Sequence, residues 1–203
     1  MKVKVIPTGP IRANCYVVFD EKTCEAAVID PGSFDCEVKN AINGLTVKYI
    51  ILTHGHFDHI LGAGDLKENT GALLLIHELD EECLTKSSAN LLGDFSFGKE
   101  INLKADRLIK DGDKITFGDI TLKVIHTPGH SKGSITLVCE EEKVLFTGDT
   151  LFAGGIGRTD FYGSNPTDMR KSVMKLMSLE GDYHVYPGHD IDTLLSVERK
   201  YYV

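Results

Sequence analysis

Between residues 54 and 59 the chain reads His54-Gly55-His56-Phe57-Asp58-His59, which places four potential metal ligands within six residues. The run is preceded by a stretch from Val47 to Leu52 that is rich in β-branched residues and predicts a buried strand. It is followed by apolar residues that recur from Ile60 to Leu66 and predict a helix. The expected local structure is therefore a strand, a ligand-rich loop and a helix, and the rest of the fold must accommodate it.

Two more histidines stand after Pro-Gly pairs much further along the chain, in Pro128-Gly129-His130 and Pro187-Gly188-His189. With the first run they account for five of the eight histidines. Any one of them alone is more simply explained by a polar loop, but their clustering in three places favours a metal site. We interpret His126 and His184, at the ends of expected strands, as residues that support a ligand or lie satisfied in the core rather than as direct ligands. His77 opens an expected short helix and is interpreted as structural or exposed.

The ligand types indicate a catalytic metal site. Imidazole and carboxylate groups without thiolate suit Zn, Fe or Mn, whereas structural zinc sites are rich in cysteine. Within the first run, His54 and His56 could share one metal ion, while Asp58 and His59, on the first turn of the next helix, could hold a second. A folded scaffold would have to bring the two distant histidines to them. We therefore expect two divalent metal ions, zinc first, with iron or manganese as alternatives.

A bridging anion is needed where two metal ions share one loop, and Asp149 is the best remaining candidate. It stands in Thr147-Gly148-Asp149-Thr150, directly after the apolar strand expected at Val144 to Phe146. An aspartate in a Gly-Asp turn would be the better interpretation if Asp149 stood alone, because such turns are common. The histidine runs elsewhere in the chain favour a ligand.

Short apolar or alternating runs predict two groups of strands. The first group is a meander that ends in the turn Asp30-Pro31-Gly32, with strands at Lys2 to Ile6, Cys15 to Phe19 and Ala26 to Ile29. The later strands are expected at Ala72 to Ile76, Lys114 to Phe117, Thr121 to Ile125, Ser134 to Val138, Val144 to Phe146 and Val185-Tyr186. A short acidic helix is expected at His77 to Leu84, a long loop from Thr85 to Asp106, and an amphipathic helix from Asn165-Pro166 onward. No linker divides the sequence, which predicts one domain over residues 1–203.

The composition restricts the class of protein. The 203 residues are 42% hydrophobic and 26% charged, as in soluble globular proteins, and their formal net charge is −8. An acidic chain without a basic run offers no field that attracts nucleic acid. No stretch approaches the roughly 20 apolar residues that span a bilayer, and Pro7 stands before any apolar segment long enough for a signal peptide. The five cysteines form no C-x-x-C pair, which suits a reducing compartment better than a disulfide framework. We expect a cytoplasmic protein with a small-molecule substrate and no nucleic-acid or membrane partner, either a monomer or a homo-oligomer.

In combination, the motifs resemble the metallo-β-lactamase superfamily and, within it, the glyoxalase II-like branch. They are Thr53-His54-Gly55-His56-Phe57-Asp58-His59, His126-Thr127-Pro128-Gly129-His130, Gly148-Asp149-Thr150-Leu151-Phe152, Gly157-Arg158-Thr159-Asp160-Phe161 and Pro187-Gly188-His189. The resemblance implies an α+β fold, a four-layer αβ/βα sandwich with a dinuclear metal site at one edge of the sheets. It also implies a ligand set in which His54, His56 and His130 hold the first metal, Asp58, His59 and His189 hold the second, and Asp149 bridges them.

The same resemblance implies a binuclear hydrolase of a small thioester such as S-lactoylglutathione. Two metal ions lower the pKa of a bound water, and the resulting hydroxide attacks the carbonyl. The leaving thiolate comes from a thiol of pKa about 8.5, so it needs little general acid catalysis. The expected catalytic carboxylates are the bridging Asp149 and Asp58, which would also orient the hydroxide. Arg158 either binds a substrate carboxylate, as the equivalent basic residue does in glyoxalase II-like enzymes, or pairs with Asp160.

Two other functions stay open. A persulfide dioxygenase of the same superfamily uses a single iron held by the equivalents of His54, His130 and Asp149, and it also has an aspartate after the last histidine, as Asp190 is here. A non-catalytic metal-binding module of the same fold is the other. Full-length glyoxalase II has a further C-terminal helical region that supplies much of its glutathione site, whereas 14 residues follow His189 in this sequence, which leaves the thiol carrier undefined.

Overall fold

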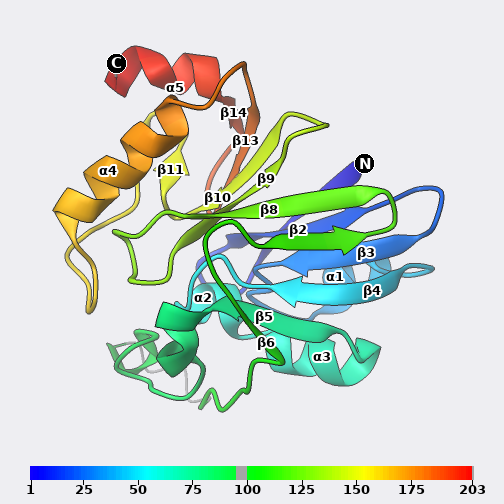
Figure 1. Cartoon of the computed structure of the whole chain (residues 1–203). Coiled ribbons are helices and arrows are strands. Elements are labelled where there is room, and N and C mark those ends of the chain that lie inside the picture. Colours follow the sequence, from blue (N-terminus) through cyan, green and yellow to red (C-terminus); the bar gives the residue numbers. More distant parts are fainter. Residues whose placement is uncertain (95–99, 203) are drawn as a thin grey trace.

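Two six-stranded sheets lie face to face in the computed structural model, which describes residues 1–94 and 100–202 (Figure 1). The first sheet has the order β1(Lys2–Thr8), β2(Ala13–Phe19), β3(Glu25–Ile29), β4(Thr46–Ile51), β5(Leu73–His77) and β6(Arg107–Ile109). The second sheet has the order β14(Thr193–Leu194), β13(His184–Pro187), β10(Val144–Gly148), β9(Ile135–Cys139), β8(Ile120–His126) and β7(Lys114–Phe117). A separate two-stranded hairpin pairs β11(Leu151–Phe152) with β12(Gly155–Ile156).

Helices cover the outer face of each sheet (Figure 1). The first sheet packs on α1(Cys36–Ala41), α2(Phe57–Ile60) and α3(Ala63–Thr70), and the second packs on α4(Pro166–Met177) and α5(Leu195–Tyr202). Two short 3-10 helices, η1(Glu78–Leu84) and η2(Leu92–Asp94), follow β5. In the described part of the chain, no helix has the length and apolar character that crossing a membrane requires.

The alternation of side chains along the strands builds three apolar layers. In β2, Cys15 and Val17 pack with the helices on the outer face, whereas Tyr16 and Val18 pack between the two sheets, because successive residues of a strand point to opposite faces. In β10, Phe146 likewise points between the sheets and Leu145 points toward α4 and α5. The order helix, sheet, sheet, helix confirms the predicted four-layer αβ/βα sandwich.

Most of the predicted strands are confirmed, and so are the short acidic helix, which is a 3-10 helix, and the helix at Asn165-Pro166. The Asn165 side chain accepts hydrogen bonds from the backbone nitrogens of Thr167 and Asp168, which satisfies two donors at the start of α4. The predictions missed α1, α5, β6, β14 and the β11–β12 hairpin, all of them short. Of the long loop predicted from Thr85 to Asp106, residues 95–99 lie outside the described residues, and η2 interrupts the part that is described.

The single helix predicted from Ile60 to Leu66 is wrong, because α2 ends at Ile60 and α3 begins at Ala63. The chain turns at Gly62, whose backbone nitrogen donates to the carbonyl oxygen of Pro31 at 2.8 Å. A Cβ atom at this position would lie only 2.3 Å from the carbonyl carbon of Ser33. A close approach of the Gly62 backbone to Pro31 and Ser33 therefore coincides with the break between the two helices.

The carboxyl ends of four strands meet at one edge of the sandwich. In the second sheet, β10 is parallel to β13, and both β8 and β10 are antiparallel to β9, so β8, β10 and β13 run in the same direction. Backbone hydrogen bonds join the two sheets there, from Ile135 to Thr53 at 2.8 Å and from Asn14 to Gly188 at 2.7 Å. The segments that follow β4, β8, β10 and β13 consequently converge, as ligand-binding loops of sheets commonly do.

Gly62→Ala is expected to lower the free energy of unfolding by about 1–3 kcal/mol, because the added methyl group has to displace the Ser33 backbone. Gly155→Ala is the matched control, since a Cβ atom there meets nothing within 4 Å. Urea denaturation of both variants measures the difference. Equal midpoints for the two variants would contradict the packing role of Gly62.

Candidate metal centre

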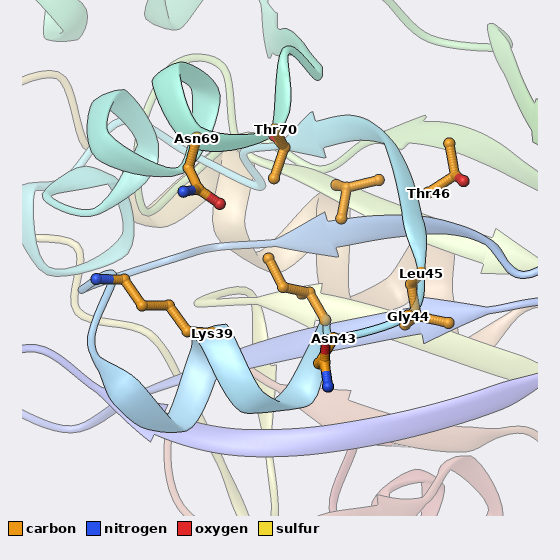
Figure 2. Close-up of a pocket in the computed structure, with 9 residues that line it drawn as sticks. Lys39, Asn43, Gly44, Leu45, Thr46, Asn69 and Thr70 are labelled. Carbon is orange, nitrogen blue, oxygen red and sulfur yellow. The ribbon is translucent and has the colours of Figure 1, made fainter.

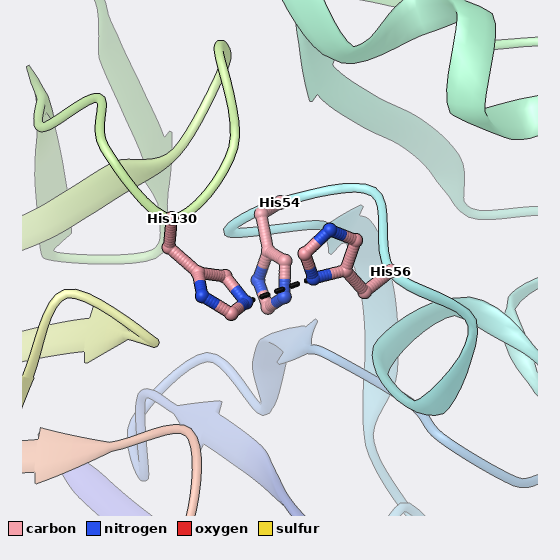
Figure 3. Close-up of side chains that lie close together, drawn as sticks. All are labelled: His54, His56 and His130. Atoms are coloured by element: carbon pink, nitrogen blue, oxygen red, sulfur yellow. Dashed lines mark hydrogen bonds between the residues drawn. The ribbon is translucent and has the colours of Figure 1, made fainter. Parts of the chain in front are cut away.

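Three histidines from two loops form the first ligand set, His54, His56 and His130. His54 and His56 lie between β4 and α2, and His130 follows β8; each offers a ring nitrogen within 4.8 Å of the others (Figure 3). The closest pair is Nδ1 of His56 and Nε2 of His130, at 2.8 Å. The structure therefore brings together the two loop histidines and the first of the distant ones.

The second ligand set contains Asp58, His59 and His189. Asp58 and His59 occupy the first turn of α2, and His189 follows β13. Oδ2 of Asp58 lies 3.2 Å from Nε2 of His59 and 3.2 Å from Nε2 of His189, and the two histidine nitrogens are 3.3 Å apart. The helix thus places Asp58 and His59 beside the distant His189, as the sequence predicts, and the His59 ring also lies next to His54 of the first set, with centroids 4.2 Å apart.

Asp149 lies between the two sets. Its Oδ2 is 3.4 Å from Nε2 of His130 in the first set, and its Oδ1 is 3.5 Å from Nε2 of His59 in the second. Room for this carboxylate depends on Gly188, where a Cβ atom would lie 2.1 Å from Oδ1 of Asp149. The glycine of the Pro187-Gly188-His189 motif therefore has a steric function beside the last histidine.

Burial and neighbouring charges shift the pKa values of the two sets differently. Burial, followed by repulsion from neighbouring histidines, holds the pKa of His54 and that of His56 well below the ordinary value, so both rings are neutral and able to bind a metal. In the second set, burial also disfavours the charged forms of the side chains, but the attraction between Asp58 and the two histidines outweighs the effect of burial. These ion pairs hold the pKa of Asp58 well below its usual range and raise the pKa values of His59 and His189.

The donor atoms of the cluster fit metal ions. Three of its buried atoms have no hydrogen-bond partner, namely Nε2 of His54, Nε2 of His56 and Oδ1 of Asp149. A buried polar atom left without a partner costs about 1–3 kcal/mol. Imidazole nitrogens and carboxylate oxygens in this arrangement match the donors of catalytic zinc, iron and manganese sites.

Asp30 is a functional residue that the sequence analysis assigned only to a turn. Its Oδ2 lies 3.0 Å from Nδ1 of His59, and its two oxygens accept hydrogen bonds from the backbone nitrogen and the hydroxyl of Thr53 at 2.7 and 2.5 Å. Asp30 also comes within ligand distance of His54 and His59, but these bonds already engage both of its oxygens. It therefore fixes the His59 ring so that Nε2 faces the second set.

Asp80 ties together the loops that carry the first set. This buried carboxylate accepts hydrogen bonds from the backbone nitrogens of Gly55 at 3.0 Å and Gly133 at 2.7 Å, and from the Ser131 hydroxyl at 2.6 Å. Gly55 lies between the two loop histidines, and Ser131 follows His130. Burial raises the pKa of Asp80, and three donors compensate for the desolvation. The sequence around Asp80 contains no motif that would have predicted its contacts with these two loops.

A pocket of about 350 Å³ lies over the ligands, and Arg158 and Phe161 are among the residues that line it. The carbonyl oxygen of Arg158 lies 2.8 Å from Nδ1 of His130, which leaves Nε2 of that ring directed at the first set. The Arg158 side chain lines the pocket and also binds Asp160 through two hydrogen bonds of 2.9 and 2.8 Å. Both roles predicted for Arg158 are therefore compatible with its position.

The other three histidines lie outside the cluster. His77 and His126 stack with ring centroids 4.2 Å apart, and Nε2 of His184 pairs with Asp192 at 2.7 Å. His77 is buried and its Nδ1 accepts from the backbone nitrogen of Leu79 at the start of η1, whereas His126 and His184 are half-exposed rather than core residues.

A separate hollow of about 460 Å³ lies between the end of α1, the start of β4 and the end of α3 (Figure 2). It is larger than the pocket over the ligands, but neither histidine nor carboxylate lines it. Its lining residues, within the described part of the chain, are Lys39, Ile42, Asn43, Gly44, Leu45, Thr46, Val47, Asn69 and Thr70. We assign no chemistry to this hollow, because it has no group that binds a metal or accepts a proton at neutral pH.

A family model described as the metallo-beta-lactamase superfamily matches residues 8–189. The chain belongs to this superfamily. It is 38% identical over 202 residues to an uncharacterized protein of Aquifex aeolicus, covering 99% of this chain and 95% of that protein. It is 31% identical over 204 residues to the hydroxyacylglutathione hydrolase GloC of Haemophilus influenzae, covering 98% and 96% of the two chains.

Solved structures of the superfamily show the same fold. The crystal structure of the BLEG-1 B3 metallo-beta-lactamase matches with a TM-score of 0.90 and 33% identity, over 98% of this chain and 97% of that one. The structure of TTHA1623 in a di-iron-bound form matches with a TM-score of 0.84 and 31% identity, over 96% of both chains. Superfamily membership and the His/Asp cluster together indicate a metallo-hydrolase that uses divalent metal ions.

Asp80→Asn is expected to weaken metal binding about 10- to 100-fold, because the amide keeps the shape of the side chain but replaces one of its two acceptor oxygens by a donor. Competition with a chromogenic chelator measures the affinity. Asp20→Asn is the matched control, since Asp20 is also buried and accepts backbone hydrogen bonds from Lys22 and Asp119, away from the ligands. The role of Asp80 would be refuted if both variants bound metal as the wild type does.

Proposed function

We propose that this protein is a binuclear metallo-hydrolase that cleaves a small thioester, with S-lactoylglutathione as the first substrate to test. The observation that carries the proposal is the position of Asp149 between the two ligand sets. Its Oδ2 lies 3.4 Å from Nε2 of His130 in the first set, and its Oδ1 and Oδ2 lie 3.5 and 3.7 Å from Nε2 of His59 and of His189 in the second. Supporting evidence comes from the relatives, one of which is named a hydroxyacylglutathione hydrolase and another, in Bacillus subtilis, a probable metallo-hydrolase.

The metal ligands in this proposal form two groups around one carboxylate. His54, His56 and His130 would hold the first ion, Asp58, His59 and His189 would hold the second, and Asp149 would contact both. Zinc is the first expectation, with iron or manganese as alternatives. Such a pair of ions supplies a water of lowered pKa and polarises the substrate carbonyl.

The residues of the chain prepare the site for this chemistry. Asp30 and the carbonyl oxygen of Arg158 hold the rings of His59 and His130 in one orientation each. The carboxyl group of Asp58 is ionised, because its pKa lies well below the ordinary range, so its oxygens accept hydrogen bonds and can orient a nucleophilic water. A thiolate leaves at neutral pH with little help from an acid, which agrees with the lack of an added proton donor among the described pocket residues.

A single-iron dioxygenase of the same fold is the second candidate. The structure of ETHE1 from Myxococcus xanthus matches all of this chain and 83% of that one, with a TM-score of 0.81 and 27% identity. The compact second ligand set favours the hydrolase, because its three members offer donor atoms within 4.8 Å of one another.

Metal content separates the two candidates. Protein purified without chelators or a metal-affinity tag is expected to contain about two equivalents of zinc, iron or manganese per chain, because two ligand sets are present. Elemental analysis measures this ratio. One equivalent of iron alone would instead favour the dioxygenase, and oxygen uptake with a persulfide would then be measured.

Asp149→Ala is expected to reduce thioester hydrolysis by at least about two orders of magnitude and to lower the metal content, because both ligand sets lose the carboxylate between them. Release of free thiol from S-lactoylglutathione gives the rate. A β-lactam is added as a second substrate, since BLEG-1 is named a B3 metallo-beta-lactamase.

The control variant is Asp119→Ala, which removes a carboxylate from an exposed ion pair with Lys22. Full turnover and full metal content in the Asp149 variant would rule out the bridging assignment.

A further inference from the structure

The walls of the pocket over the ligands are apolar. Apart from the ligands and Arg158, every described residue that lines it is hydrophobic, namely Ile11, Phe57, Leu91, Phe152, Ile156 and Phe161. Two of these side chains, Ile11 and Ile156, expose 48% and 41% of their surface, so they stand at the mouth of the pocket. Apolar side chains held in contact with water gain free energy when an apolar part of a ligand covers them.

Arg158 is the one lysine or arginine among the described residues that line the pocket. Its Nε and one terminal nitrogen donate to the two oxygens of Asp160, and its guanidinium lies 4.3 Å from the ring centroid of Phe161. The Phe161 ring in turn packs edge-on against His56 and His130. The guanidinium is therefore engaged on two sides, by a carboxylate and by an aromatic ring that is itself in contact with the first ligand set.

A substrate carboxylate would gain little from this arginine. Asp160 holds the edge of the guanidinium formed by Nε and one terminal nitrogen, so a substrate carboxylate would either bind the remaining donors with the Asp160 charge beside its own or exchange one bidentate pair for another. The pair is exposed, with 66% and 65% of the two side chains accessible, so the exchange itself costs little. The net charge of −8 on the chain adds no long-range attraction for an anion.

We propose, on the basis of the hydrolase function above, that this pocket favours thioesters that are uncharged on both sides of the reacting carbonyl over glutathione thioesters such as S-lactoylglutathione, and that Asp160 sets this selectivity by occupying Arg158. The apolar walls favour an alkyl acyl group, and a neutral thiol carrier fits the mouth formed by Ile11 and Ile156. Asp160 is a specificity-determining residue that acts through Arg158, not a catalytic one.

Three thioesters test the proposal with the metal-loaded enzyme. S-butyryl-N-acetylcysteamine is neutral, its S-succinyl counterpart carries a carboxylate on the acyl side, and S-butyrylglutathione carries carboxylates on the thiol side. The neutral thioester is expected to have a kcat/KM at least about tenfold above both anionic ones, because an unpaired carboxylate loses hydration against apolar walls.

Asp160→Asn then tests the role of Asp160. The amide frees Arg158 to bind a substrate carboxylate, so the ratio of kcat/KM for an anionic thioester to that for the neutral one is expected to rise about threefold or more. Asp119→Asn is the matched control, since it also removes a carboxylate from an exposed ion pair, with Lys22 at 2.9 Å, and Asp119 is not a lining residue of the pocket. The control is expected to leave the ratio as in the wild type.

Each other outcome has a defined meaning. If the wild type hydrolysed an anionic thioester as well as the neutral one, the proposal would be overturned. If Arg158→Ala then lowered kcat/KM for the anionic thioester alone, Arg158 would be assigned to a substrate carboxylate. A neutral preference that Asp160→Asn leaves unchanged would remove Asp160 from the explanation and so overturn its part. Failure to hydrolyse the three thioesters, with the metal bound, would refute the inference, and failure to hydrolyse S-lactoylglutathione as well would refute the thioesterase function itself.

Discussion

Seven ionisable side chains converge where the two sheets meet, and six of them are buried, so their nitrogen and oxygen atoms need partners that water does not supply. Burying such groups costs free energy unless each is hydrogen-bonded, paired with an opposite charge or bound to a metal. The second ligand set meets this requirement partly through ion pairs with Asp58 and Asp149. In the first set, His54 and His56 are neutral imidazoles, and Nε2 of each is left without a hydrogen bond. A metal ion held by these residues would supply the compensation that the protein lacks there.

The architecture of the sandwich meets this constraint by holding the ligands on rigid supports. Each ligand segment begins at the carboxyl end of a strand, and backbone hydrogen bonds across the edge fix the two sheets relative to each other. Two buried carboxylates then set the finer geometry, Asp30 through the ring of His59 and Asp80 through the loops on either side of the first set. Their own charges are stabilised by backbone amides and hydroxyl groups, which a flexible loop could not hold in place.

Chemistry and selectivity are carried by different parts of the molecule. The ligand cluster rests on strand ends in both sheets, whereas the pocket walls include Phe152 and Ile156 of the β11–β12 hairpin and the adjoining Arg158 and Phe161. These two parts are nevertheless coupled, because the backbone of Arg158 accepts the hydrogen bond that orients His130. A change in the hairpin can therefore alter the substrate while the ligands stay where the sheets place them.

The sequence by itself determined the ligand candidates and the strand before them, because metal ligands recur at short spacing and strands have a period of two. The fold class followed from the resemblance of the motifs to the metallo-β-lactamase superfamily. It could not show the break at Gly62, which arises from contact with Ser33 more than 25 residues away in the chain. Nor could it reveal the roles of Asp30 and Asp80, whose partners are backbone amides and histidines of other segments. Only the tertiary structure decided which ligands face one another and that Arg158 binds Asp160, since such contacts depend on how the sheets bring distant segments together.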